Sequence, residues 1–239
     1  MRFLSFIFVF IFTINIAAQS PAVSNLFANG ATEAEAGRYG EALKSYKTAL
    51  FAAENEYLDA GYRARLHYNV GVCYFRLDQF RPAANHFKSA ILLKHDYARA
   101  HYALGMARTR LREWKDASTS FGRLIELDPK NGEAWFDLAF VSIALNDLST
   151  AETAFARSIA FGSVDSPLSH NNIGVILAVK GDLTAAEREF ENAIEMSGGR
   201  LHEAKNNLEF CRAKRLGKPG LIASSEFRFA VRDAGLHVG

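Results

Sequence analysis

The chain has 239 residues, of which 49% are hydrophobic and 23% charged, so it is long enough for one or two packed domains and too apolar to be a disordered tail. Its net charge of +2 provides no field strong enough to recruit nucleic acid or an anionic membrane surface. Two cysteines are too few for a disulfide-stapled miniprotein or a cysteine-built zinc site. A compact, mostly helical chain remains.

The first segment has the composition of a secretory signal. Met1 and Arg2 precede an apolar run over residues 3–16, which is followed by the small pair Ala17-Ala18. The run has roughly 14 residues, fewer than the ~20 that a membrane-spanning helix needs. We therefore predict an exported protein, periplasmic or secreted, from which residues 1–18 are removed; the alternative is an uncleaved segment that anchors the chain in a membrane. No Cys follows the small pair, so no lipid anchor is expected.

A regular repeat occupies the middle of the chain. In five places an alanine precedes an aromatic residue by four positions, and successive alanines are 41, 34, 34 and 35 residues apart. Another small residue lies twelve positions before each of the last four alanines. A period near 34 predicts units of helix, tight turn and helix, in which the small residue lets two helices approach closely. The pairs are Ala42 and Tyr46, Ala83 and Phe87, Ala117 and Phe121, Ala151 and Phe155, and Ala186 and Phe190; the upstream residues are Gly71, Gly105, Ala139 and Gly174.

These residues resemble the tetratricopeptide repeat, most clearly in Asn69-Val70-Gly71 and in the repeat-ending Asp128-Pro129. The resemblance covers residues 24–216 and implies an all-α, right-handed superhelical solenoid. We expect a linker at 19–23, units at 24–57, 64–97, 98–131, 132–166 and 167–200, and a capping helix at 201–216 that is more polar than an internal helix. The extra residues around 54–61 predict a longer helix pair or a loop after the first unit.

Residues that could carry chemistry have structural explanations. His67, His101 and His170 share one repeat column, but equivalent positions of neighbouring units lie ~18 Å apart, whereas the nitrogen ligands of zinc lie ~2.0 Å from the metal. Cys73 and Cys211 belong to helices far apart and are expected to be separate thiols. No phosphate loop, nucleophile elbow or zinc-binding His-Glu-x-x-His run occurs. We therefore expect no catalytic residue, metal or cofactor; the alternative is an enzyme or small-ligand binder that uses His101 or the tail.

The resemblance places function in a concave groove built mainly from the first helix of each unit, along which a peptide or helix of another protein lies. Tyr68 and Val72 stand where family members that capture C-terminal carboxylates carry Lys and Asn, so that clamp is not expected. Aromatic and arginine side chains favour a partner segment with apolar and acidic groups. The predicted groove residues are Arg65, Tyr68, Asn69, Phe75, Arg76, Arg99, Tyr102, Met106, Arg110, Phe136, Asp137, Phe140, Asn171 and Asn172.

The tail, residues 217–239, leaves the period. Large apolar residues alternate with other residues from Phe227 to Val231, which is consistent with a short strand. A helical turn between Ser225 and Gly235, disorder, and docking of the tail into the molecule's own groove are the other interpretations.

The sequence therefore predicts a non-catalytic scaffold or adaptor that binds another protein in an exported envelope or secretory-pathway assembly. The alternative is a structural solenoid that associates with copies of itself into a homo-oligomer. Nucleic acid is not expected as a partner.

Overall fold

The computed structural model describes residues 21–54, 58–217 and 226–231, and within them it contains eleven α-helices and no strand. This confirms the predicted all-α architecture. The predicted signal segment and most of the predicted tail lie outside the described residues. The helices are α1 (Pro21–Glu35), α2 (Tyr39–Glu54), α3 (Ala60–Arg76), α4 (Phe80–Leu93), α5 (Ala98–Arg110), α6 (Trp114–Leu127), α7 (Gly132–Ala144), α8 (Leu148–Ala160), α9 (Ser166–Lys180), α10 (Leu183–Met196) and α11 (His202–Arg215).

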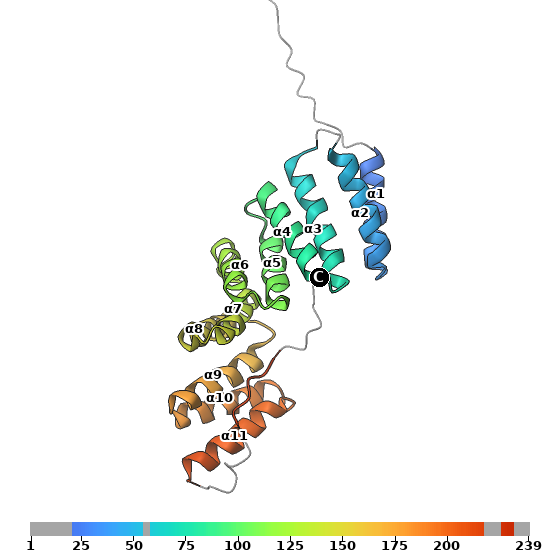
Figure 1. The fold of residues 1–239 in the computed structure, drawn as a ribbon. Helices are drawn as coiled ribbons and strands as arrows, with labels where there is room; N and C mark the ends of the chain where they lie inside the picture. The colour runs from blue at the N-terminus through green and yellow to red at the C-terminus, as the bar shows by residue number, and fades with distance from the viewer. Residues whose placement is uncertain (1–20, 55–57, 218–225, 232–239) are drawn as a thin grey trace, which may run out of the picture.

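The helices stack in sequential pairs to form a curved solenoid (Figure 1). Each helix packs on its pair-mate and on the nearest helix of the adjoining pair, as a linear array of repeats requires. In addition α3 touches α5, and α9 touches α11. Helices on the inner side of a curved stack come closest together, so the odd-numbered helices form the concave wall.

The predicted column of small residues explains how each pair closes. A Cβ atom placed on Gly71, Gly105 or Gly174 would lie 2.6 Å from the ring of a phenylalanine on the partner helix. That phenylalanine is sixteen residues further along the chain, and in all three pairs its side chain is at most 1% exposed. In these three pairs, a glycine of the first helix faces a phenylalanine ring of the second helix, and the ring fills the space that the glycine leaves.

The turn inside each pair places one residue in the left-handed region of backbone space. The residues and their φ angles are Gly37 (74°), Asp78 (57°), Arg112 (58°), Asn146 (60°) and Gly181 (94°). Their spacing reproduces the spacing of the repeat alanines, so the same turn recurs in every unit. After two of these turns an aspartate caps the next helix: the Asp147 and Asp182 carboxylates accept hydrogen bonds from main-chain N–H groups of the first turn.

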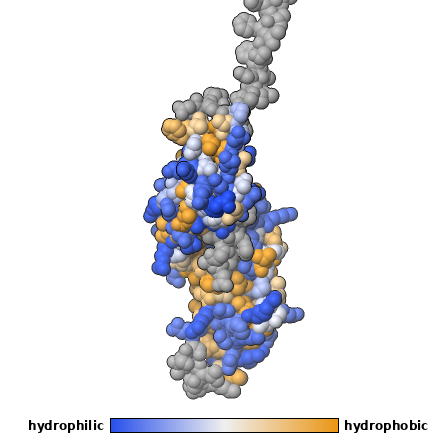
Figure 2. Space-filling view, turned by 90° about the vertical axis from the view of Figure 1, so that its right-hand side faces the viewer, coloured by the Kyte–Doolittle hydropathy of each residue, from blue (hydrophilic) through white to orange (hydrophobic). Residues whose placement is uncertain are grey.

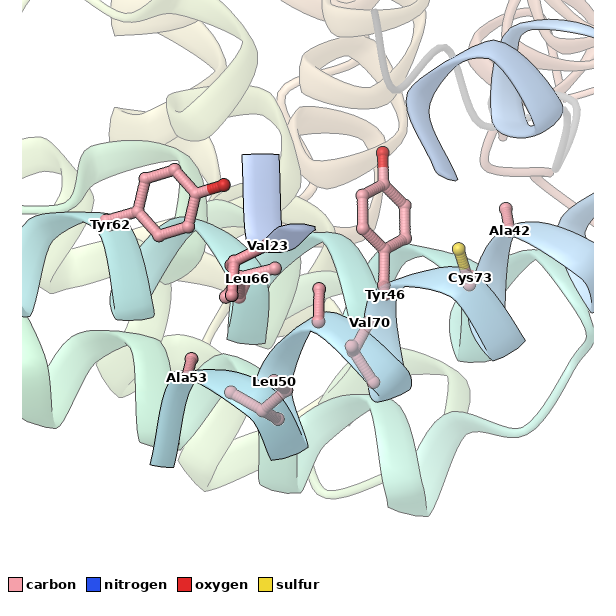
Figure 3. Close-up of a cluster of buried hydrophobic side chains, with 10 residues drawn as sticks. Val23, Ala42, Tyr46, Leu50, Ala53, Tyr62, Leu66, Val70 and Cys73 are labelled. Carbon is pink, nitrogen blue, oxygen red and sulfur yellow. The ribbon is translucent and has the colours of Figure 1, made fainter. Parts of the chain in front are cut away.

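The N-terminal end of the solenoid has a hydrophobic core of mostly aliphatic side chains with two tyrosines, Tyr46 and Tyr62 (Figure 3). Phe27 contacts the rings of Tyr46 and Tyr62 at centroid distances of 5.6 and 5.5 Å. Cys73 is buried in the same cluster, and burial raises the pKa of its thiol to about 12. Cys211, at the other end of the solenoid, is also buried, and the two cysteines are separate free thiols, as predicted.

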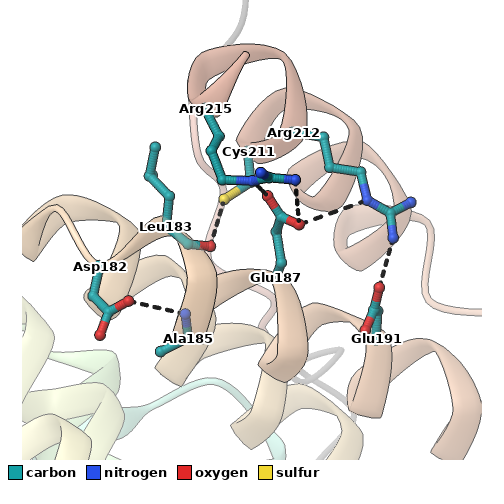
Figure 4. A network of polar contacts seen from close by, with 8 residues as sticks. All are labelled: Asp182, Leu183, Ala185, Glu187, Glu191, Cys211, Arg212 and Arg215. Atoms are coloured by element: carbon teal, nitrogen blue, oxygen red, sulfur yellow. Dashed lines mark hydrogen bonds and ion pairs between the residues drawn. The ribbon is translucent and has the colours of Figure 1, made fainter.

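The last helix closes the C-terminal end. Figure 4 shows Glu187 of α10 between the guanidinium groups of Arg212 and Arg215 of α11, with Arg215 Nε 2.6 Å from its carboxylate. Arg212 also pairs with Glu191 at 2.6 Å. The polar residues predicted for a capping helix therefore attach α11 to α10, while its other face is buried at Ala204, Leu208 and Cys211. None of the described helices is both long and apolar enough to cross a bilayer.

Candidate functional site

The concave wall near the C-terminal end holds a short segment of the tail. Residues 226–231 are neither helix nor strand, and they lie against α9, α10 and α11 (Figure 1). Of the four interpretations of the tail, docking into the molecule's own groove describes this segment. The rest of the predicted tail beyond Gly217 lies outside the described residues.

Two asparagines hold the main chain of this segment. The Asn207 side chain accepts a hydrogen bond from the N–H of Arg228 at 2.9 Å and donates one to the carbonyl oxygen of the same residue at 2.8 Å. Asn172 does the same for Ala230, at 2.7 and 2.9 Å. Each amide group thus satisfies both main-chain polar groups of one residue, as a neighbouring strand would.

A third asparagine connects these two. Asn171 donates to the side-chain oxygen of Asn172 at 3.1 Å and to the carbonyl oxygen of Arg228 at 3.2 Å, and its own oxygen accepts from Asn207 at 2.9 Å. All three side chains are at most 2% exposed. Removing one amide would leave buried partners without a hydrogen bond, so the network acts as a unit.

The aromatic side chains of the segment enter the apolar core between the repeats. The Phe227 ring lies 4.7 Å from the ring of Phe210 and is stacked on Phe190 at 6.2 Å, with Lys214 Nζ 5.5 Å from its centroid. Phe229 packs against the buried clusters of both the α7–α9 and the α9–α11 regions. The segment therefore combines main-chain hydrogen bonds with two aromatic anchors two residues apart, the spacing at which side chains of an extended chain share a face.

The asparagines occupy equivalent places in consecutive repeats. Asn172 and Asn207 are 35 residues apart, and they bind tail residues that are two apart. The same column contains Asp137 on α7, Ala103 on α5 and Asn69 on α3. Sequence reasoning identified Asn69, Asp137, Asn171 and Asn172 but not Asn207, whose neighbourhood it assigned only to the cap. The signal was the run Asn206-Asn207-Leu208, which repeats Asn171-Asn172-Ile173.

The other predicted groove residues of α3 and α5 lie in surroundings that range from core to surface. Tyr68 is half-buried against Tyr97, at a centroid distance of 5.2 Å; burial raises the pKa of both hydroxyls, and Arg99 opposes the rise. Phe75 is buried against Phe80. Arg65 and Arg99 are exposed, Arg76 stacks over Tyr39, Arg110 stacks over Phe80, and Tyr102 and Met106 are half-buried.

On α7 the predicted residues are more enclosed. Phe136 is 2% exposed, and its ring lies 5.6 Å from that of Phe155 inside the helix pair. Asp137 and Phe140 are half-buried. Figure 2 shows hydrophobic surface near the upper end of the solenoid and in its lower half, with mostly hydrophilic surface between them.

The histidines of the repeat column have separate partners. His67 lies 3.1 Å from His86 between their Nδ1 atoms, His101 contacts the carbonyl oxygen of His95 at 2.9 Å, and His170 pairs with Glu189. Burial, with further contributions from His67 and Lys47, lowers the pKa of His86 to about 4. Within residues 21–54, 58–217 and 226–231, no three His, Cys, Asp or Glu side chains are grouped to hold a metal ion.

Comparison with known proteins identifies the class. Family models of the tetratricopeptide repeat match residues 22–91 and 102–166, which together make up more than half of the chain. The chain belongs to the tetratricopeptide repeat family, whose members are generally non-catalytic scaffolds, and its fold supports a role in protein–protein interaction. No curated protein matches the sequence.

Solved structures share the fold at low sequence identity. A MamA structure is 22% identical, with a TM-score of 0.65 over 71% of this chain and 94% of that chain. A tetratricopeptide repeat protein from Parabacteroides merdae is 20% identical, with a TM-score of 0.69 over 84% and 77%. YrrB, described as having an unusual peptide-binding site, is 21% identical, with a TM-score of 0.65 over 80% and 90%.

Proposed function

We propose that this protein is a non-catalytic scaffold that binds an extended segment of a partner protein on the concave wall formed by α9 and α11. The observation that carries the proposal is the docked segment, whose Arg228 and Ala230 main chains are bound by Asn207 and Asn172. Hydrogen bonds to the main chain do not depend on the side chain of the bound residue, so the same amides suit another extended chain. YrrB, a tetratricopeptide repeat protein with an unusual peptide-binding site, has a similar fold, which supports the proposal.

A binding titration tests the proposal. The full chain carrying Phe227→Ala and Phe229→Ala, which loses both aromatic anchors, is titrated with a labelled peptide of residues 224–233 and followed by fluorescence anisotropy. We expect saturable binding, weakened at least ~10-fold by Asn207→Ala because two main-chain hydrogen bonds of about 1 kcal/mol each are lost.

The matched control is Asn206→Ala, which removes the same side chain from the adjacent, exposed position of α11. It should leave the affinity unchanged. Absence of saturable binding, or equal weakening by the two alanine variants, refutes the proposal. Thermal melting of each variant verifies that the solenoid itself is folded.

We propose further that the partner carries acidic groups where it crosses α3 and α5. Arg65 and Arg99 are exposed there, and the positive charges of both act on the Tyr97 hydroxyl. The Arg65 guanidinium lies over the rings of Phe27 and Tyr62. Guanidinium groups bind carboxylates with two hydrogen bonds, and tyrosine rings provide apolar area with few rotors to immobilise. An Arg65→Ala/Arg99→Ala variant should bind the partner more weakly and with less dependence on salt; an unchanged salt dependence would contradict this part of the proposal.

Export is also a proposal. The apolar run over residues 3–16 and the pair Ala17-Ala18 have the form of a cleavable signal, and α1 begins three residues after Ala18. Mass spectrometry of the protein purified from its native cells should give a chain that starts at Gln19. A chain that retains residues 1–18 would instead support the membrane-anchored alternative.

A further inference from the structure

The docked segment shows which side chains the groove selects. Phe227 fits between two aromatic rings and under an ammonium group, an environment that favours an aromatic side chain. Phe229 contacts two apolar clusters. Ala230 is 2% exposed, so a larger side chain at this position would have to displace the residues that cover it.

The remaining positions are not selective. The side chain of Arg228 is exposed, although its main chain is held by two asparagines. Val231 is 55% exposed. The site therefore selects the side chains at three of four consecutive positions of an extended segment. The first and third are aromatic, the fourth is small, and the second can be any residue.

The site accommodates one chain at a time. The Asn172 oxygen accepts from both Ala230 and Asn171, and the Asn207 amide nitrogen donates to both Arg228 and Asn171. A second peptide would find the same hydrogen-bonding atoms already used and the same aromatic contacts filled. A ligand from outside must therefore displace residues 226–231.

We infer that the partner of this protein presents a segment with the pattern aromatic–any–aromatic–small, which binds α9 and α11 in the register of residues 227–230 and displaces the protein's own segment. This inference rests on the proposed function and specifies the partner's chemistry.

The expected size of the competition follows from the tether. A segment joined to its site by a short linker has an effective concentration of about 1 mM. If a free peptide of the same sequence binds with a dissociation constant of about 10 μM, the tethered segment weakens its apparent affinity by about 100-fold. Even a dissociation constant of about 100 μM gives a weakening of about 10-fold.

The experiment compares two full-length proteins, the wild type and Phe227→Ala/Phe229→Ala. Both are titrated with the labelled peptide of residues 224–233. The double variant should bind at least ~10-fold more tightly than the wild type, because its own segment no longer competes. A Glu226→Ala/Val231→Ala variant, altered at two exposed positions of the same segment, should bind like the wild type.

Unlabelled peptides then test the pattern in competition against the double variant. Replacing the residue that corresponds to Phe227 or Phe229 by Ala, or Ala230 by Leu, should weaken binding at least ~10-fold, since each change empties or overfills a buried position. Replacing Arg228 by Ala should change it less than ~2-fold. If the peptide with Leu in place of Ala230 binds as tightly as the unaltered peptide, the inferred pattern is wrong.

The outcomes separate this inference from the proposed function. If neither protein binds the peptide, the proposed function fails. If both bind it equally, the groove binds peptides but the tethered segment does not occupy the site, and the inference of displacement fails alone. Light scattering gives a further check: a wild-type dimer that the double variant does not form would mean that the segment binds a second copy of this chain, which would also overturn the inference.

Discussion

Replacing Asn207 by alanine tests the asparagine network in the intact protein. The change removes two hydrogen bonds to the main chain of Arg228, at 2.8 and 2.9 Å, and one to Asn171 at 2.9 Å. Only the two bonds to Arg228 hold the segment, so at about 1 kcal/mol for each net hydrogen bond, docking of residues 226–231 should weaken by about 2 kcal/mol. The helices of the solenoid need not open for this, because the segment can leave as a unit.

Amide hydrogen exchange measures this effect directly. The N–H groups of Arg228 and Ala230 are hydrogen-bonded to asparagine side chains and should be protected in the wild type. A weakening of about 2 kcal/mol corresponds to about 30-fold faster exchange at these amides, with the rate of an unstructured peptide as the upper limit. Amides in the middle of α9 should exchange as before.

The reasoning fails in either of two cases. If Arg228 and Ala230 exchange equally slowly in the wild type and in Asn207→Ala, the amide contacts do not determine docking. If Asn206→Ala accelerates their exchange as much, the effect comes from α11 as a whole and not from the buried side chain.

Three further predictions concern stability and are measured by urea unfolding. Gly105→Ala should lower the free energy of unfolding by about 1–3 kcal/mol, because the new Cβ would lie 2.6 Å from the Phe121 ring. Gly122→Ala should raise it by about 0.5–1 kcal/mol, because a Cβ there has no neighbour within 4 Å. Equal effects of the two substitutions would contradict the packing argument. Arg112→Gly should raise the free energy of unfolding by up to about 1 kcal/mol, since φ is 58° at this turn, and a loss would show that the Arg112 side chain contributes more than the backbone relief. Burial, His67 and Lys47 lower the pKa of His86 from 6.5 to about 4, so between these pH values the unfolded state binds more protons than the folded state. The free energy of unfolding should therefore fall by about 1–2 kcal/mol as the pH drops from 6.5 to 4, after allowance for the partial exposure of His86. His86→Gln should remove most of this pH dependence, and an unchanged pH dependence would assign it to other groups.

The repeat period predicted most of the fold because each unit obeys the same local packing rule. A glycine and a phenylalanine sixteen positions apart identify the inner contact of a helix pair, so Gly71, Gly105 and Gly174 could be placed from sequence alone. The turn residues in the left-handed conformation also follow this spacing. Three of them are Asp78, Arg112 and Asn146, although glycine is the residue expected at such a turn. Their conformation therefore becomes evident only in the structure.

The site was less predictable because it depends on contacts between distant parts of the chain. Phe136 and Asn171 occupy equivalent places in consecutive units and are both buried, yet one packs inside its helix pair and the other binds the tail. Periodicity assigns a position to a helix face but does not show what covers that face. The alternation at Phe227 and Phe229 indicated an extended segment, and only its partners showed where it lies.

Helix α11 contributes both to the C-terminal end of the helix stack and to the binding of the docked segment. It terminates the stack through Arg212 and Arg215, and it supplies Asn207 and Phe210 to the docked segment. Gain or loss of a unit beside α11 would separate Asn172 from Asn207 and destroy the binding register. A unit added or deleted at the α1 end would leave that register intact, so variation in repeat number among descendants of this gene should be tolerated only at the N-terminal side.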